Sequence, residues 1–386
     1  MNTRRRLLAG AITGAGVTLA GKAFAQAANS KAQVNFSTLA GGNDDDKLTN
    51  FMNAYRAATY KPTLVLDEAR YYQFQKQQTI FNGFAMVGGG SRAVDQARSQ
   101  NVVPQVIKLR LPGTLQGWLK LPGVTWGIYL AGLSFDVSPT CRLFDADTIY
   151  NIETSTFRDI SCQNAASLFG KSGAQQLFTA CVFDGFWNVS NVADMAFNLG
   201  GSDCRFTPQM LLLDSAVNNT ALIGPTKYLM QLTAQSKTTL SNMYITAEQH
   251  SAIKITGGNN MVRLHHCEIE GRNAGQPCYG ALIVSDGKYV QLSDSWVSYG
   301  MSNPGAAGHS PQDGGLIMVT GGTFEVLNCH TQQATNVSSP FIYATGSGTK
   351  VIVRNIVGEG YTGKPVVKTT AGAVADVDGS VSLTSG

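Results

Sequence analysis

The chain has 386 residues, of which only 14% are charged, and it contains 42 glycines. Its formal net charge is +4, but four basic residues and no acids lie within residues 1–25, so the rest of the chain is close to neutral. A protein that binds nucleic acid keeps a basic excess, so this balance gives no support for that class of partner. Low charge with many glycines favours a β-rich protein that works outside the cytoplasm.

Residues 1–25 read as an export signal rather than as part of the fold. Arg4-Arg5-Arg6 is followed by a glycine- and alanine-rich stretch and then by the small-residue site Ala23-Phe24-Ala25. The apolar stretch is too short and too rich in glycine to span a bilayer. The pattern predicts a twin-arginine-type signal cleaved near Ala25, a periplasmic or secreted protein, and no integral membrane anchor. We expect residues 26–35 to be a flexible N-terminus.

One helix is expected, at residues 44–55. Three aspartates begin it, and Leu48, Phe51, Met52 and Tyr55 follow at helical spacing. The next two segments, 62–67 and 83–90, read as short strands, and the second ends in a glycine turn.

Short apolar strands then recur along the chain with turns between them. The repeat is 20–30 residues in most places, which is typical of a solenoid, whereas a sandwich usually repeats every 8–12 residues. We therefore expect one parallel β-helix domain over residues 36–370, and a C-terminal tail or last rung over 371–386. The strands are 133–136, 160–163, 181–184, 243–246, 267–270, 295–298 and 326–329.

The acidic "NDDD" helix start, the strand "PTLVLD" and the "GFAMVGGG" turn resemble the pectate-lyase-like superfamily. These proteins are single-stranded right-handed parallel β-helices, and bacteriophage tailspikes are among them. The resemblance implies an all-β solenoid whose N-terminal helix caps its open end. It does not specify a reaction, since the superfamily holds lyases, hydrolases, epimerases and adhesins. A homotrimer is compatible with it, as tailspike-like relatives often trimerise.

The stretch 267–275, CEIEGRNAG, indicates which side chains of a predicted strand point inward and which point outward. If Cys267 and Ile269 point into the core, then Glu268 and Glu270 both point outward, because side chains alternate along a strand. We take Phe135, Cys162, Phe183, Ile245, Ile269 and Val297 as equivalent inward positions. The residues that follow them then form an outward column: Asp136, Gln163, Asp184, Thr246, Glu270 and Ser298.

Such a column suits a polysaccharide groove, with carboxylates as general acid and base. The catalytic candidates are Asp184, Asp203, Glu270, Arg272 and Tyr299. Asp203 follows two glycines, where a backbone can approach a ligand closely. Arg272 is expected beside Glu248, where it either assists a carboxylate or forms a surface ion pair. Tyr299 opens a long loop and is an acid/base or sugar-stacking candidate.

The substrate-binding candidates are Glu248, Glu268, Gln163, Trp187, Asn273 and His309. Trp187 is either a sugar platform or a core residue, and His309 lies in a loop where most histidines are bystanders. No metal or other cofactor is expected, since His265-His266 has no third ligand at metal spacing. Most of the seven cysteines are expected to be small buried residues.

Two functions follow from these observations. The first is an exported enzyme that cleaves a polysaccharide, as a glycoside hydrolase or a polysaccharide lyase, with hydrolysis favoured over elimination. The second is a β-helix that binds carbohydrate without cutting it, as an adhesin or a tailspike-like protein does. Both take a polysaccharide as partner and neither takes a nucleic acid.

Overall fold

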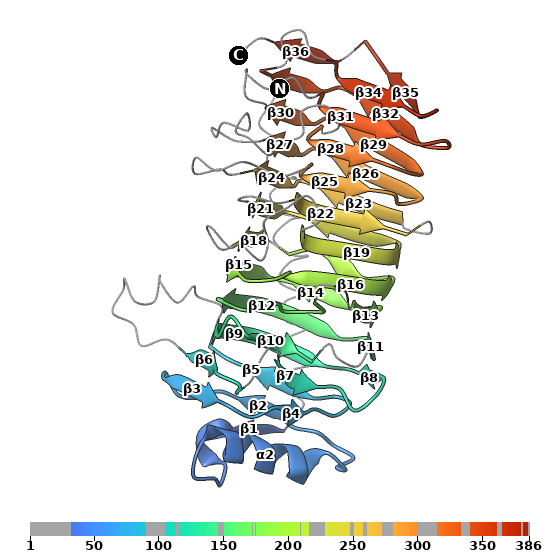
Figure 1. Cartoon of the computed structure of the whole chain (residues 1–386). Coiled ribbons are helices and arrows are strands. Elements are labelled where there is room, and N and C mark those ends of the chain that lie inside the picture. The colour runs from blue at the N-terminus through green and yellow to red at the C-terminus, as the bar shows by residue number, and fades with distance from the viewer. Residues whose placement is uncertain are drawn as a thin grey trace, which may run out of the picture.

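The structure is a computed structural model. It describes residues 32–89, 105–112, 116–145, 150–171, 173, 175–208, 210–215, 228–247, 251–257, 261–271, 281–298, 315–332, 340–360, 365–379 and 381–384. The described strands coil into a parallel β-solenoid with strands stacked along one axis (Figure 1), as the repeat predicts. Every printed pairing between them is parallel, for example β24 with β27 and β27 with β30.

Three faces run along the solenoid, and most rungs contribute a stretch of strand to each. The ten-strand face consists of β8 (Thr125–Trp126), β11 (Asn151–Glu153), β13 (Gln176–Thr179), β16 (Phe197–Ser202), β19 (Tyr228–Ser236), β22 (Ser251–Thr256), β25 (Ile283–Ser285), β28 (Ile317–Val319), β31 (Ile342–Thr345) and β34 (Val367–Thr370).

The chain then passes to what we call the Arg263 face. Its strands are β1 (Gln33–Asn35), β2 (Thr63–Val65), β5 (Ala85–Val87), the first halves of β9 (Tyr129–Val137) and β12 (Thr156–Gln163), β14 (Val182–Asp184), β17 (Arg205–Phe206), β20 (Thr238–Ser241), β23 (Met261–His265), β26 (Tyr289–Ser293), β29 (Thr323–Leu327), β32 (Lys350–Arg354) and β35 (Val374–Val377).

The third face, here called the Glu270 face, completes each rung. Its strands are β3 (Tyr71–Phe74), β6 (Val106–Leu109), the second halves of β9 and β12, β15 (Phe186–Val192), β18 (Met210–Ser215), β21 (Met243–Ala247), β24 (Glu268–Gly271), β27 (Trp296–Ser298), β30 (His330–Gln332), β33 (Val357–Glu359) and β36 (Ser382–Thr384). A separate sheet near the N-terminal end joins β4 (Gln78–Thr79), β7 (Gln116–Lys120) and β10 (Cys141–Phe144).

A single residue in left-handed conformation turns the chain from the Arg263 face to the Glu270 face. Glycine, asparagine and aspartate tolerate this conformation best, which explains most of the residue types found there. Side-chain amides stack along the corner: Asn328 Nδ2 donates to Asp294 Oδ1 at 3.2 Å, and Asn355 Nδ2 donates to Asn328 Oδ1 at 2.9 Å. The corner residues are Gly132, Asp159, Gly185, Asn242, His266, Asp294, Asn328 and Asn355.

Inward side chains of successive rungs stack on one another in the core. Phe157, Phe183 and Phe206 form one such stack, with ring centroids 5.2 and 4.3 Å apart and rings tilted by 20° in both pairs. Cys267, Ile269 and the other residues taken as inward are all buried. The six cysteines in the described part of the chain are unbridged and buried, as the composition suggested.

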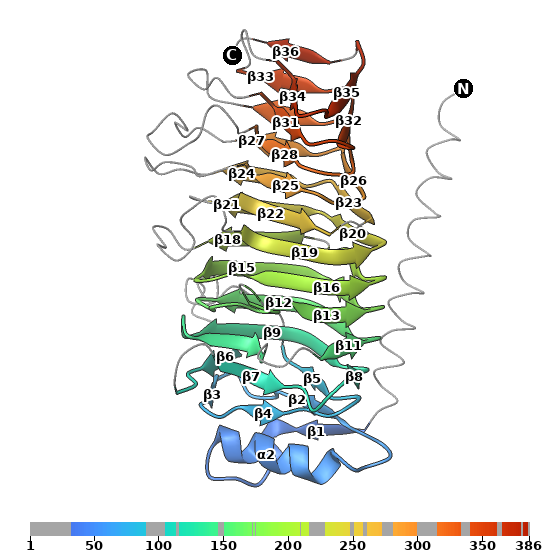
Figure 2. The ribbon, with the colours of Figure 1, turned by 45° about the vertical axis from the view of Figure 1, so that its right-hand side comes forward.

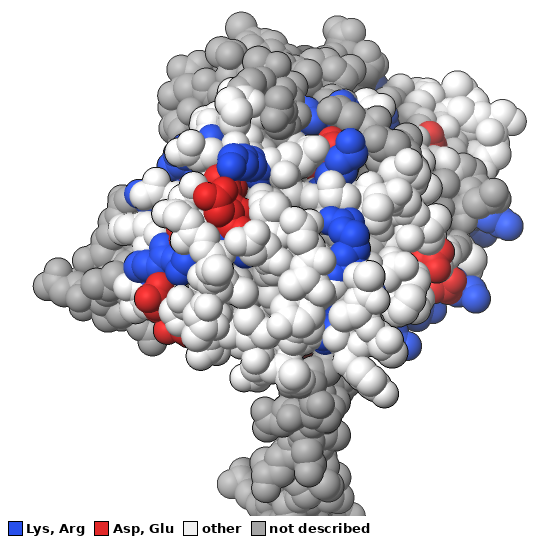
Figure 3. All heavy atoms as spheres, turned by 90° about the horizontal axis from the view of Figure 1, so that it is seen from below, with Lys and Arg blue, Asp and Glu red and all other residues white. Residues whose placement is uncertain are grey.

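Helix α2 (Asp44–Tyr55) occupies exactly the residues expected and lies across the N-terminal end of the solenoid (Figures 1 and 2). Asn43 caps it by accepting a hydrogen bond from Asp46 N at 2.9 Å, and Phe51 packs on Phe84. Figure 3 shows this end with acidic and basic side chains next to one another rather than in patches of one sign. That the helix serves as a cap stays a prediction.

The outer limits of the fold differ slightly from those expected. Strand β1 (Gln33–Asn35) already pairs with β2, so the solenoid begins inside the segment 26–35 that was expected to be flexible. Strands β35 and β36 continue it beyond residue 370, so they form a last rung rather than a free tail. No helix in the described part of the chain is long and apolar enough to cross a membrane.

Candidate functional site

Two glutamates of β24 point outward from the middle of the Glu270 face. Glu268 and Glu270 flank the buried Ile269 and are both half-buried. They are two residues apart on one strand, which places their Cα atoms about 6.6 Å apart on the same side of the sheet. The phase inferred from CEIEGRNAG is therefore correct for this rung.

Tyr244 connects this pair to the preceding rung. It lies directly beside Glu268 in the register of β21 and β24, and its hydroxyl donates to Glu270 Oε2 at 2.9 Å. The hydrogen bond fixes one carboxylate oxygen of Glu270, while nothing in the described structure bonds the carboxylate of Glu268. The two carboxylates thus have different surroundings, although they are on the same strand.

The next two rungs supply an aromatic surface. Trp296 stands beside Glu268 in the register of β24 and β27, and 39% of its surface is exposed. His330 on β30 meets the indole edge-on, with ring centroids 4.9 Å apart, and its Nε2 lies 3.9 Å from Glu359 Oε1. An exposed indole ring next to a carboxylate is a suitable platform for the apolar face of a sugar ring.

The surroundings shift the protonation of two groups. Partial burial and then the negative charge of Glu270 raise the pKa of Glu268 above its usual value. Burial and the hydrogen bond to Glu270 raise the pKa of the Tyr244 hydroxyl, so it stays protonated at neutral pH. Two neighbouring carboxylates in unlike environments are the arrangement that separates a general acid from a general base.

The structure corrects the position of Asp184. Its strand pairs Phe183 with Phe157 and Asp184 with Arg158, so Asp184 belongs to the Arg263 face and not to the column of Glu270. Three strand steps, about 14 Å along the axis, separate it from the rung of Glu268 and Glu270. Asp184 Oδ1 accepts a hydrogen bond from Gly185 N at 2.6 Å, and its Oδ2 lies 4.0 Å from Arg158. It cannot act with Glu270 as an acid/base pair.

Asp203 is also far from the glutamate pair. It lies exposed at a corner between the ten-strand and Arg263 faces, in left-handed conformation with φ of 57°. The glycine before it serves strand packing rather than ligand approach, since a Cβ on Gly201 would lie 1.8 Å from Phe178 O. The expected convergence of Asp184, Asp203 and Glu270 on one site is therefore wrong.

Trp187 is a core residue, and the sugar-stacking interpretation of it is wrong. None of its surface is exposed, its Nε1 donates to Asp184 O at 2.7 Å, and it packs on Phe206 at 5.9 Å. Gln163 does lie on the Glu270 face, paired with Asp136 of β9, but several rungs from Glu270. Five other candidates lie outside the described residues: Glu248, Arg272, Asn273, Tyr299 and His309.

Sequence reasoning missed Tyr244, Trp296 and His330. The same phase could have found the first two, because they precede the inward residues Ile245 and Val297 just as Glu268 precedes Ile269. Among the described residues, no group of three histidine, cysteine, aspartate or glutamate side chains could hold a metal ion.

Comparison with known proteins supports the fold and leaves the activity open. No protein-family model matches the chain, and no curated protein matches its sequence. Among solved structures it is similar to the A-module of the Azotobacter vinelandii mannuronan C-5 epimerase AlgE4, with a TM-score of 0.50 and 12% identity over 91% of this chain and 97% of that one. It also matches the tailspike of Acinetobacter phage vB_ApiP_P1, with a TM-score of 0.45 and 12% identity, over 90% of this chain and 59% of that one.

A third match is the DFA-IIIase of Arthrobacter chlorophenolicus A6, with a TM-score of 0.43 and 9% identity over 91% of this chain and 94% of that one. Identities this low are informative for architecture alone. The stacked parallel strands and the match to the epimerase module, at a TM-score of 0.50, show that the chain has the pectate-lyase-like parallel β-helix fold.

Proposed function

We propose that this protein is a glycoside hydrolase that binds a polysaccharide along the Glu270 face. The observation that carries the proposal is the pair Glu268 and Glu270. Both face outward from β24, with Tyr244 and Trp296 beside Glu268 on the two neighbouring strands. The similar structure with a TM-score of 0.50 is the module of an epimerase that acts on mannuronan, which supports an action on carbohydrate.

Glu268 serves as the general acid. Its raised pKa keeps it protonated to higher pH than an ordinary glutamate, so it can protonate the leaving oxygen of the glycosidic bond. Glu270 serves as the general base that activates a water molecule, and Tyr244 orients it. Trp296 holds a neighbouring sugar ring against the wall.

Hydrolysis with inversion fits the pair better than elimination does. Inverting enzymes keep their two carboxyl groups about 6.5–9.5 Å apart, to leave room for the water, and retaining enzymes keep them about 5–5.5 Å apart. The Cα atoms of Glu268 and Glu270 are about 6.6 Å apart, and side chains of this length can hold their carboxyl groups at the inverting separation. A lyase needs a base that removes a carbon-bound proton, and the protonated Tyr244 is poorly suited to that task.

The test is product release from a panel of polysaccharides that includes polymannuronate and α-1,3-glucan. Wild type should release reducing ends without unsaturated products, and Glu268→Gln and Glu270→Gln should each lose at least about 100-fold in kcat. The matched control is Glu325→Gln. Glu325 accepts a hydrogen bond from the hydroxyl of Tyr289, as Glu270 does from Tyr244, but it lies on the Arg263 face. Polymer binding without cleavage by wild type would contradict the proposal and favour a binding protein.

We further propose that the protein is exported, on the basis of its N-terminal sequence. The mature chain should then begin at Gln26, and the precursor should accumulate in cells that lack twin-arginine translocation. Mass spectrometry of the N-terminal peptide from the exported fraction tests this. A secreted chain that retains Arg4-Arg5-Arg6 would contradict it.

A further inference from the structure

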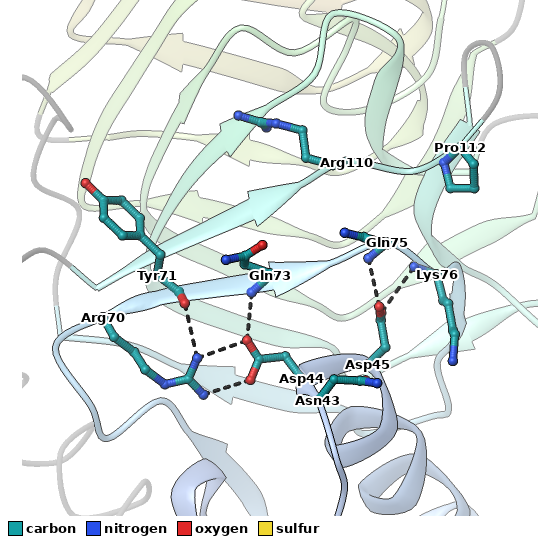
Figure 4. Close-up of a pocket in the computed structure, with 10 residues that line it drawn as sticks. All are labelled: Asn43, Asp44, Asp45, Arg70, Tyr71, Gln73, Gln75, Lys76, Arg110 and Pro112. Atoms are coloured by element: carbon teal, nitrogen blue, oxygen red, sulfur yellow. Dashed lines mark hydrogen bonds and ion pairs between the residues drawn. The ribbon is translucent and has the colours of Figure 1, made fainter.

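A cavity of about 650 Å³ lies at the N-terminal end of the solenoid (Figure 4). Its floor is β3, the N-terminal strand of the Glu270 face in the described part of the chain. Arg110 and Pro112 border it on one side and the start of α2 on the other. The ten lining residues are Asn43, Asp44, Asp45, Arg70, Tyr71, Gln73, Gln75, Lys76, Arg110 and Pro112.

The charged groups of this cavity are already paired. Asp44 binds Arg70 through two hydrogen bonds of 2.7 and 2.9 Å and accepts Gln73 N at 2.7 Å. Asp45 accepts the backbone N–H groups of Gln75 and Lys76 at 2.9 and 3.1 Å. These carboxylates therefore attach α2 to β3 and are not available as metal ligands or catalytic groups.

The basic groups are engaged in the same manner. Arg110 donates to Asp136 Oδ2 at 3.1 Å and to its backbone oxygen at 2.8 Å. Lys76 Nζ lies 3.3 Å from Asp46 Oδ1. A ligand in this cavity would therefore contact neutral groups and charged groups that are already in ion pairs. A strongly charged ligand would gain little binding free energy from them.

Three neutral polar groups remain free in the described structure. The backbone N–H groups of Gln73 and Gln75 are bonded to the aspartates of α2. In the described part of the chain their exposed side-chain amides have no partner, and neither has the hydroxyl of Tyr71. Each amide offers two donor hydrogens and an acceptor oxygen, which together suit the hydroxyl groups of a sugar. The Tyr71 ring is held by the ammonium of Lys108, 4.1 Å from its centroid.

The cavity and the glutamate pair lie on one continuous wall. Gln73 pairs with Lys108, Lys108 pairs with Asp136, and Asp136 pairs with Gln163. The sheet continues through β15, β18 and β21 to Glu270. Seven strand steps separate Gln73 from Glu270, a distance of about 34 Å along the axis.

We propose that this cavity is a distal subsite for the chain that Glu268 and Glu270 cleave, and that it recognises sugar hydroxyl groups rather than charge. This rests on the proposed function, since it places the same polymer along the same wall. A chain that reaches the cavity from the cleavage point must span about 34 Å. The enzyme should therefore prefer long chains to short ones, and the additional affinity should depend little on salt.

The test compares kcat/KM for size-graded oligosaccharides of α-1,3-glucan and of polymannuronate. With the polymer that wild type cleaves, kcat/KM should rise by about tenfold once chains span both sites, consistent with a few hydrogen bonds. Gln73→Ala/Gln75→Ala should lose that rise for long chains and match wild type on short ones. Gln291→Ala, a glutamine on the Arg263 face, is the control and should behave as wild type.

Two results separate this inference from the proposed function. If the double variant and wild type depend identically on chain length, the distal subsite is wrong and the hydrolase stands. If neither protein cuts any chain, native affinity gels that contain each polymer decide the question. Weaker retention of the double variant on long chains then supports the subsite without the enzyme, and equal retention overturns it. The urea midpoint of the double variant confirms that it is folded.

Discussion

Tyr244 on β21 donates its hydroxyl to Glu270 on β24 across 2.9 Å, so one rung orients a carboxylate of the next. Tyr244→Phe keeps the ring and removes only the donor. We expect kcat to fall by up to about 100-fold with little change in KM, because a misplaced base is costly in the transition state. Tyr289→Phe removes the corresponding hydroxyl beside Glu325 and should leave kcat unchanged. An equal loss in both variants would mean that the effect is structural.

The pH profile should depend on the charge of Glu270. Glu268 must be protonated to act as the acid, so its pKa sets the alkaline limb of kcat/KM. Its pKa is raised by burial and by the negative charge of Glu270. Glu270→Gln removes that charge and should lower the pKa of Glu268, as a carbon-13 titration of labelled glutamate side chains would show. An unchanged pKa in this variant would mean that the two carboxylates do not interact.

The sequence predicts which side chains of a strand point inward and which point outward. It does not predict to which face of the solenoid each strand belongs. Ile245, Ile269 and Val297 do pair across β21, β24 and β27, because inward and outward side chains alternate strictly along a strand. The same alternation occurs on all three faces, so Phe183 looked equivalent to Cys162. The left-handed residue Gly185 marks the corner between the Arg263 face and the Glu270 face, and Phe183 lies before it. The sequence does not mark this corner clearly.

The candidate site was partly predictable for a related reason. Glu268 and Glu270 can be recognised within a single strand. Asp184 is placed in the outward column only by an incorrect alignment of rungs, and Asp203 is a candidate only because it follows two glycines. A distal subsite could not be inferred from the sequence at all. It depends on the aspartates of α2 binding β3, and this contact joins residues about thirty positions apart.

The two tryptophans near the wall should respond oppositely to substitution. Trp187 is fully buried in the aromatic core, so Trp187→Ala should lower the free energy of unfolding by about 3–5 kcal/mol. Trp296 is 39% exposed, so Trp296→Ala should cost much less stability but weaken polymer binding. Urea unfolding and affinity electrophoresis measure the two effects. A loss of binding in Trp187→Phe, with Trp296→Ala binding normally, would reverse the assignment of the sugar platform.

The amide stack at the corner should contribute measurably to stability. Asn328 has a left-handed φ of 52° and bonds Asp294 and Asn355 through its side chain. Asn328→Gly keeps the conformation and loses both hydrogen bonds, which should cost about 1 kcal/mol at this exposed position. Asn328→Ala also strains the backbone and should cost about 1–2 kcal/mol more. Equal unfolding free energies for the two variants would show that the conformation is not strained.

The buried thiols should make the fold sensitive to alkali. Burial raises the pKa of Cys267 and of Cys329 to about 12 each, and it raises that of Cys162 further. An unfolded thiol has a pKa of about 8.5, so above that pH the unfolded chain binds fewer protons than the folded one. Stability should therefore be unaffected below about pH 8 and should decline as the pH rises toward 12.

Thiol labelling checks the same burial directly. Cys278 lies outside the described residues, so Cys278→Ser leaves only the six buried cysteines. This variant should react with a thiol reagent at neutral pH only as fast as it unfolds, since a buried thiol is inaccessible to the reagent. In urea all six should react at once. Rapid labelling of the native variant would show that at least one of these side chains is accessible, and peptide mapping would identify the strand that opens.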